Sequence, residues 1–128
     1  MRIRSAFTAD GRTWRVEDGD RVIPPPSGPA ALGVADPAPV QLPTGDWLMA
    51  VKSFIAPAAQ PPQPGGIDTH QVASATSPDG LTWTRDEGIR VPRVSVPAAI
   101  NDNDQRVLLY FVQPPSEPGR PETVACAV

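Results

Sequence analysis

The stretch that decides the fold is Ser77-Pro78-Asp79-Gly80-Leu81-Thr82-Trp83, because a similar stretch with the same Asp, Gly, Thr and Trp occurs once before in the chain. The earlier copy is Thr8-Ala9-Asp10-Gly11-Arg12-Thr13-Trp14, which begins 69 residues before the second. The flanking residues align without gaps as well, over residues 3–22 and 72–91. Self-similarity at a fixed spacing is the signature of a repeat architecture. The chain is therefore expected to build one structural unit more than once.

A second block repeats at a spacing of 60 residues, since residues 37–40 and 47–51 match residues 97–100 and 107–111. The spacing differs by 9 because the first copy carries a longer loop at residues 24–33. Loops absorb such insertions at little cost. The last five residues resemble residues 72–76 and indicate the start of a third copy that the chain does not finish.

Each unit is expected to contain four short strands. The first lies near residues 35–42 and again near 94–100, and the second covers residues 47–55 and 107–112. The unbroken apolar run of the second strand predicts burial on both faces, as between stacked sheets. The third strand precedes the Asp-Gly turn, and the fourth runs from about Thr82 to Val91. This reading predicts nine strands, or just over two four-stranded sheets.

The 18 prolines limit the alternatives, because they leave little room for a long helix after Pro24. Candidate segments are short and rich in Val, Thr and Trp, which favour strands. We therefore expect an all-β fold. A β-sandwich also uses short strands with regular turns and stays open as the alternative. The long repeat favours a β-propeller, in which each unit is a blade around a central channel.

Both seven-residue stretches resemble the Asp-box, usually written Ser-x-Asp-x-Gly-x-Thr-Trp, in a form one residue shorter between Asp and Gly. The resemblance implies an Asp-box (BNR-repeat) β-propeller related to sialidases and other five- or six-bladed glycosidases. The chain would then hold the outer strands of one blade (1–23), one complete blade (34–91) and most of a further blade (94–128). As about two blades of a longer protein, it would cover its apolar faces with missing blades or by self-association.

The residues that carry this resemblance are expected to be structural. Asp accepts hydrogen bonds from turn amides, Gly permits a positive φ, and Trp packs a large ring into the hairpin or between sheets. The resemblance places these turns at the periphery of a blade, away from the central substrate site. The structural set is Thr8, Asp10, Gly11, Thr13, Trp14, Ser77, Asp79, Gly80, Thr82 and Trp83.

Asp36 is the candidate catalytic residue. Its segment, residues 34–40, resembles the Asp-Pro opening of an inner strand in arabinanase-like and invertase-like five-bladed glycosidases, where such an Asp is nucleophile, general base or a tuning carboxylate. Its counterpart in the next unit is Val96, so the repeat itself does not require an acid there. Arg93, which matches Gly33, is the candidate for binding a substrate carboxylate or hydroxyls. The alternatives are an Asp that caps a strand end before Pro and an ordinary surface Arg.

Composition excludes several classes of partner. The net charge of -3, with acids and bases scattered along 128 residues, offers no patch for nucleic acid. No apolar run approaches the roughly 18 residues that span a bilayer. The single Cys126 is expected to be a small buried hydrophobe, and His70 has no second His nearby, so we expect no metal and no cofactor. The first residues lack the apolar segment of a signal peptide, and the compartment stays open.

Two functions follow from the resemblance. In the first, the complete protein is a glycoside hydrolase in which Asp36 is one of two or three inner carboxylates supplied by different blades, since hydrolysis normally needs two. In the second, a non-catalytic propeller binds a carbohydrate or a protein partner through loops such as 24–33 and 57–66. A sialidase would need an arginine triad and a Tyr/Glu pair, and Tyr110, the one Tyr, is expected in the core instead. Whether the chain is an enzyme stays open.

Overall fold

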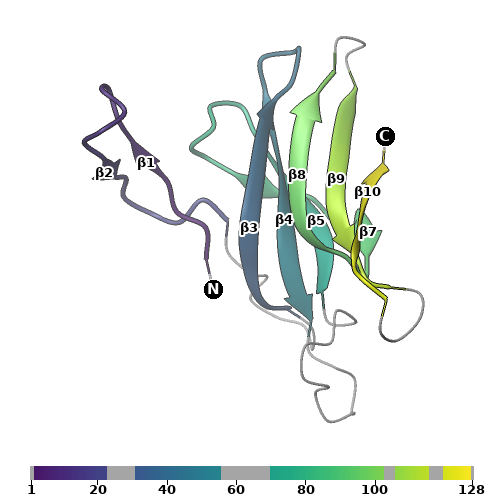
Figure 1. Ribbon diagram of the computed structural model, residues 1–128. Helices are drawn as coiled ribbons and strands as arrows, with labels where there is room; N and C mark the ends of the chain where they lie inside the picture. Colours follow the sequence, from purple (N-terminus) through teal and green to yellow (C-terminus); the bar gives the residue numbers. More distant parts are fainter. Residues whose placement is uncertain (1, 23–30, 56–69, 103–105, 116–119, 128) are drawn as a thin grey trace.

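The computed structural model describes residues 2–22, 31–55, 70–102, 106–115 and 120–127. These residues form ten β-strands, with no helix among them (Figure 1). Every strand pair is antiparallel, and none of the sheets in the described part closes into a barrel. This part of the chain also contains no helix that is long and apolar enough to cross a membrane. The prediction of an all-β fold is confirmed.

The largest sheet, here called the central sheet, is an antiparallel meander in the order β3-β4-β5-β6, with β7 also paired to β5. Its strands are β3 (Ala31–Gln41), β4 (Trp47–Ile55), β5 (His70–Ser77), β6 (Thr84–Arg85) and β7 (Val91–Pro92). The predicted continuous fourth strand is thus split in two, with Gly88 at φ 82° between the halves. This split accounts for ten strands where nine were predicted.

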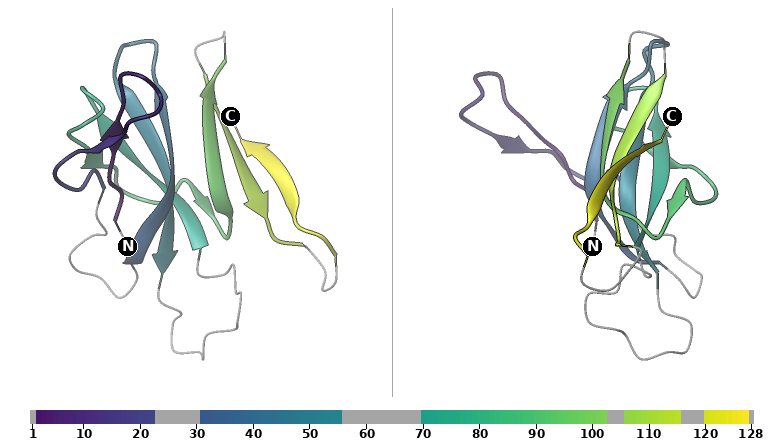
Figure 2. Two further views of the ribbon diagram at one scale, coloured as in Figure 1. Left: turned by 60° about the vertical axis from the view of Figure 1, so that its left-hand side comes forward. Right: turned by 45° about the vertical axis from the view of Figure 1, so that its right-hand side comes forward.

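Two smaller units flank the central sheet (Figures 1 and 2). The N-terminal hairpin, residues 2–22, pairs β1 (Ala6–Phe7) with β2 (Arg15–Val16) and closes with a bridge between Ile3 and Val22. The C-terminal sheet has the order β10-β9-β8 and lies against the opposite face of the central sheet. Its strands are β8 (Ser95–Asn101), β9 (Val107–Gln113) and β10 (Thr123–Ala127).

The core has two layers that meet at β4. One layer lies between the hairpin and the central sheet and contains Ile3, Val22, Val34, Met49, Val51, Ala73 and Ala75, with the partly buried Trp83 against it. The other lies between the central and C-terminal sheets and contains Ala38, Ala50, Val72, Val94 and Phe111. Adjacent residues of β4 therefore point into different layers, as the unbroken apolar run predicts.

The second such run, in β9, is buried on one face alone. Phe111 faces the central sheet and is 8% exposed, whereas Tyr110 is 37% exposed on the outer face. The prediction that Tyr110 lies in the core is wrong, because no described segment covers that face of the C-terminal sheet. The same applies to Cys126, which pairs with Tyr110 across β9 and β10 and is exposed.

The strand registers confirm the repeat seen in the sequence. In the hairpin Ala6 pairs with Val16, and 69 residues later Ala75 pairs with Arg85. At the spacing of 60, the pair of Ala38 and Ala50 recurs as Ala98 and Tyr110. The same backbone unit is thus built more than once from different side chains.

Candidate functional site

A β-bulge places Asp36 within β3. The register of β3 against β4 shifts between Ala35 and Ala38, and Asp36 adopts φ 49°. The register of β8 shifts at the equivalent place, between Ser95 and Ala98, and Val96 also adopts φ 49°. Asp tolerates this left-handed conformation, whereas for a β-branched residue it is an outlier. The bulge therefore belongs to the repeat, and the acid belongs to the first copy alone.

Asp36 forms an ion pair with Lys52, the one Lys of the chain. Lys52 lies on the neighbouring strand β4, where its backbone is paired with Ala35, and its side chain is 14% exposed. The Lys52 ammonium lies 5.1 Å from the centre of the Phe54 ring, within the range of a cation–π contact. The carboxylate side chain is 35% exposed, so solvent or a ligand can reach it.

His70 completes this group from β5, where it is paired with Phe54. The two rings meet edge to face, with centroids 4.9 Å apart and an interplanar angle of 89°. Burial lowers the pKa of His70 below its ordinary value, and the Lys52 ammonium lowers it further, while Asp36 opposes both effects. Asp36, Lys52, Phe54 and His70 therefore form one electrostatically linked group across three strands, here called the Asp36 cluster.

Sequence reasoning identified Asp36 but missed its partner. Lys52 is the one charged residue of β4, and it shares the period of two with Ala50 and Phe54, which places all three on one face. A lone charge in a strand that is buried on both faces needs a counter-ion, so this signal was present. The pairing with Asp36 could not be read from the sequence because the bulge changes the register of β3.

The structure places Arg93 in the link between β7 and β8, which joins the central sheet to the C-terminal sheet. It is exposed and adopts φ 57°. A role for Arg93 in substrate binding stays a prediction. The predicted binding loops lie outside the described residues over 24–30 and 57–66.

The two Asp-Gly turns use their side chains inside the turn. The Asp79 carboxylate accepts hydrogen bonds from the backbone amides of Thr82 (2.6 Å) and Leu81 (2.8 Å), and Ser77 Oγ accepts one from Gly80 (2.9 Å). The amides lower the pKa of Asp79 to about 2.

The first turn repeats this arrangement bond for bond. The Asp10 carboxylate accepts from the amides of Thr13 and Arg12, both at 2.8 Å, and Thr8 Oγ1 accepts from Gly11 at 2.9 Å. These amides hold the pKa of Asp10 well below its usual range. In both turns, the Asp carboxylate thus accepts hydrogen bonds from the backbone amides of its own turn.

A second repeated group was missed by sequence reasoning. In the hairpin Ser5 Oγ donates to the Glu17 carboxylate (2.5 Å) and accepts from Arg21 Nε (2.5 Å). In the central sheet Ser74, Asp86 and Arg90 make the same two bonds, at 2.5 and 2.8 Å. All three positions keep the spacing of 69, so the aligned copies contained the signal. This trio ties the third strand of each unit to its fourth.

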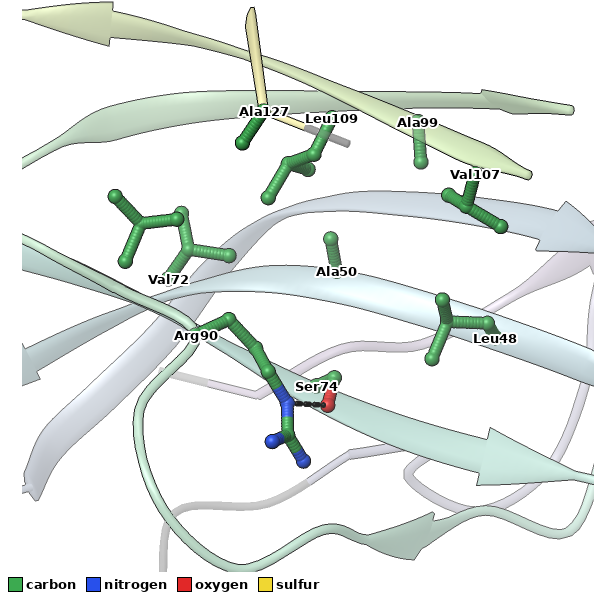
Figure 3. Close-up of a pocket in the computed structure, with 10 residues that line it drawn as sticks. Leu48, Ala50, Val72, Ser74, Arg90, Ala99, Val107, Leu109 and Ala127 are labelled. Carbon is green, nitrogen blue, oxygen red and sulfur yellow. Dashed lines mark hydrogen bonds between the residues drawn. The ribbon is translucent and has the colours of Figure 1, made fainter. Parts of the chain in front are cut away.

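An apolar cleft of about 270 Å³ opens between the central and C-terminal sheets (Figure 3). Its lining is Leu48, Ala50, Val72, Ser74, Arg90, Val91, Ala99, Val107, Leu109 and Ala127. The polar groups there are already engaged, since Arg90 Nε donates to Ser74 Oγ and Arg90 Nη2 lies 3.6 Å from the Asp86 carboxylate. The lining of this cleft is therefore mainly apolar, and its Arg and Ser side chains are already bonded to protein groups.

The Asp36 cluster has the chemistry to bind a polyhydroxylated ligand. Its carboxylate accepts hydrogen bonds and its ammonium donates them, and the half-buried Phe54 ring, which carries the Lys52 ammonium over one face, adds apolar surface beside them. Among the described residues, no three His, Cys, Asp or Glu side chains are grouped to hold a metal ion.

Comparison with known proteins adds no assignment to this geometry. No protein-family model, curated protein or solved structure matches the chain.

Proposed function

We propose that the chain is part of an Asp-box β-propeller that acts on glycans, and that Asp36 is one carboxylate of its site. The observation that carries this proposal is the bulge shared by β3 and β8, because one copy holds an acid where the other holds Val96. Bulges re-aim side chains and are over-represented next to active sites. An acid added to a repeated backbone feature that functions without one is a candidate for function.

In this proposal Asp36 acts on the sugar, as nucleophile, general base or a carboxylate that tunes another acid. Lys52 fixes the orientation of the carboxylate and donates to a sugar hydroxyl, and Phe54 holds the ammonium in place. Glycoside hydrolysis with two carboxylates needs a partner about 5–9.5 Å away. A neighbouring blade of the complete protein would supply that partner.

A non-catalytic carbohydrate-binding propeller is the second candidate. The observation that favours it is the ion pair itself, since a carboxylate beside an ammonium presents an acceptor and a donor to adjacent hydroxyls. This candidate needs no second carboxylate.

Glycosidase assays of the complete protein, which would supply the second carboxylate, and of its Asp36→Asn variant test the proposal. Asn tolerates the left-handed backbone, so the variant is expected to stay folded, with a lower urea unfolding midpoint because the Lys52 ammonium loses its ion pair, while it loses the release of sugar from chromogenic glycosides and polysaccharides. Asp46→Asn, an exposed acid in the turn between β3 and β4, is the matched control and is expected to keep full activity. Unchanged turnover in Asp36→Asn removes Asp36 from the mechanism. Saturable glycan binding without any sugar release by the native protein supports the second candidate instead.

A further inference from the structure

A second cleft, of about 310 Å³, lies between the N-terminal hairpin and the central sheet. It is lined by two indoles, two guanidinium groups and the Asp79 carboxylate, which accepts hydrogen bonds from the amides of its own turn, among smaller side chains: Ile3, Arg4, Ser5, Arg21, Pro37, Pro39, Trp47, Met49, Asp79, Gly80 and Trp83. This lining differs from the apolar core beside it. Pockets that combine aromatic faces with a few placed polar groups are typical ligand sites.

Both indoles are held at Gly80, which adopts φ 74°. Two atoms of the Trp47 ring would lie 3.4 Å from a Cβ built on Gly80, so the ring packs directly on the turn backbone. Trp83 Nε1 donates to the carbonyl oxygen of Gly80 at 2.9 Å. Neither Trp is fully buried, so each ring keeps accessible surface.

The two arginines of this cleft differ in how firmly hydrogen bonds and burial hold their side chains. The Arg21 side chain is 10% exposed and is fixed by Ser5 and by Glu17, whose carboxylate lies 3.1 Å from Nη2. Arg21 Nη1 also reaches the carbonyl oxygen of Leu81 at 3.4 Å, which links the hairpin to the turn of the central sheet. Arg4 is exposed and makes one long bond, of 3.4 Å, to the carbonyl oxygen of Glu17. Arg4 is therefore the cation that can turn toward a ligand.

The repeat supplies an internal reference for this cleft, because the cleft in Figure 3 is its counterpart. Six lining positions correspond at the spacings of 69 and 60: Ile3 and Val72, Ser5 and Ser74, Arg21 and Arg90, Pro39 and Ala99, Trp47 and Val107, Met49 and Leu109. The counterpart cleft has no aromatic residue in its lining. Stacking of the sheets thus does not require an aromatic residue at position 47.

We infer that the cleft between the hairpin and the central sheet binds one pyranose residue of a glycan, and prefers a pyranose that carries a carboxylate. The C–H groups of the sugar ring, which are weakly positive, pack on the negative faces of the Trp47 and Trp83 indoles. The sugar carboxylate pairs with Arg4 at the rim. This site is separate from the Asp36 cluster and does not depend on catalysis there.

Saturation-transfer NMR tests the inference, with methyl glucuronide as the acidic probe and methyl glucoside as the neutral one. Both are expected to receive saturation from the protein, with tighter binding of the glucuronide. Arg4→Gln is expected to weaken glucuronide binding about tenfold and to leave the glucoside unaffected. The matched control is Arg12→Gln, an exposed Arg of the same hairpin that does not line the cleft, and it is expected to change neither.

Trp47→Val copies the counterpart cleft and is expected to abolish binding of both sugars. A shift of the indole N–H signals needs no variant, so it keeps the test decisive if Trp47→Val unfolds. Glucuronide is expected to shift the Trp47 and Trp83 signals and to leave Trp14, which is 61% exposed on the hairpin, unchanged. Absence of saturable transfer from both sugars, or a shift confined to Trp14, overturns the inference. Asp36→Asn is expected to bind both sugars normally, which separates this site from the proposed catalytic one.

Discussion

Two equivalent junctions hold this protein together, and they differ in what they present to a ligand. Between the hairpin and the central sheet the cleft is lined by two indoles, whereas between the central and C-terminal sheets it is lined by aliphatic side chains. The hydrogen-bonded frame is the same in both, since the trio of Ser5, Glu17 and Arg21 recurs in the next unit. The hydrogen-bonded trio therefore holds the same backbone in both units, and the residues that line the clefts can differ without changing that backbone.

Equivalent residues of the two fourth strands also differ in burial, since the Arg is more buried in the first copy and the Trp in the second. Arg21 and Arg90 make equivalent bonds, yet their side chains are 10% and 46% exposed. Trp83 packs against the buried core layer, while its counterpart Trp14 is 61% exposed. Local hydrogen bonds form the turn in either setting, and the neighbouring sheet decides how much burial adds to it.

Truncation of the two equivalent tryptophans should give the largest difference. Trp83→Ala is expected to lower the free energy of unfolding by about 2–3 kcal/mol, because it leaves a cavity against the core. Trp14→Ala is expected to change it by less than about 0.5 kcal/mol, as for an exposed residue. Urea unfolding followed by circular dichroism measures both. If both variants lost the same free energy of unfolding, burial would not distinguish the two copies of the turn, contrary to this expectation.

Substitutions at the two bulge positions should give smaller effects, and the two substitutions should change stability in opposite directions. Val96→Asn is expected to stabilise the protein by about 1 kcal/mol, since Asn tolerates the positive φ that a β-branched residue resists. Asp36→Val is expected to destabilise it by about 1–2 kcal/mol through the same strain, with a further loss because the ammonium of Lys52 loses its partner. The midpoints of urea unfolding report both changes. A destabilised Val96→Asn variant would show that the two bulges are not equivalent.

Acid titration of the two turns should give the smallest effect. Folding lowers the pKa of Asp79 to about 2 and holds that of Asp10 well below its usual range, so the stability that each carboxylate contributes is present above the unfolded pKa of about 4 and is lost as pH falls toward the folded pKa. Asp10→Asn and Asp79→Asn should each make the fall of the urea midpoint between pH 4 and 2 shallower, because an amide does not titrate. A similar reduction of this fall in both variants would support the interpretation that hydrogen bonds within each turn, and not the neighbouring sheet, set the contribution of its Asp. If both variants showed the same dependence of the urea midpoint on pH as the unsubstituted protein, that interpretation would be contradicted.

Much of the fold was predictable because its signals are local or periodic. The Asp-Gly turns bond within seven residues, and the second strands carry unbroken apolar runs. The split of the fourth strand was not predictable, since it depends on the turn at Gly88 between two short pairings with β5. Burial of Tyr110 was also misjudged, because an apolar run reports that a strand can be covered on both faces and not that it is.

The candidate site was likewise predictable only in part from the sequence. Asp36 stood out because it departs from its own repeat, and this comparison needs the sequence alone. Its partnership with Lys52 and the contact of His70 with Phe54 depend on strand register across β3, β4 and β5, which a bulge can change by one residue.

The sequence by itself determined the repeated unit, its turns and the class of fold, because hydrogen bonds within a turn and the period of a strand are written in consecutive residues. The tertiary structure alone decided which equivalent positions meet a neighbour. It packed the partly buried Trp83 against the core and left Trp14 exposed, paired Asp36 with Lys52, and brought Arg4 of the hairpin to the same cleft as Trp47 of the central sheet. These contacts join residues distant in the chain, and sheet stacking and register, which no single segment encodes, bring them together.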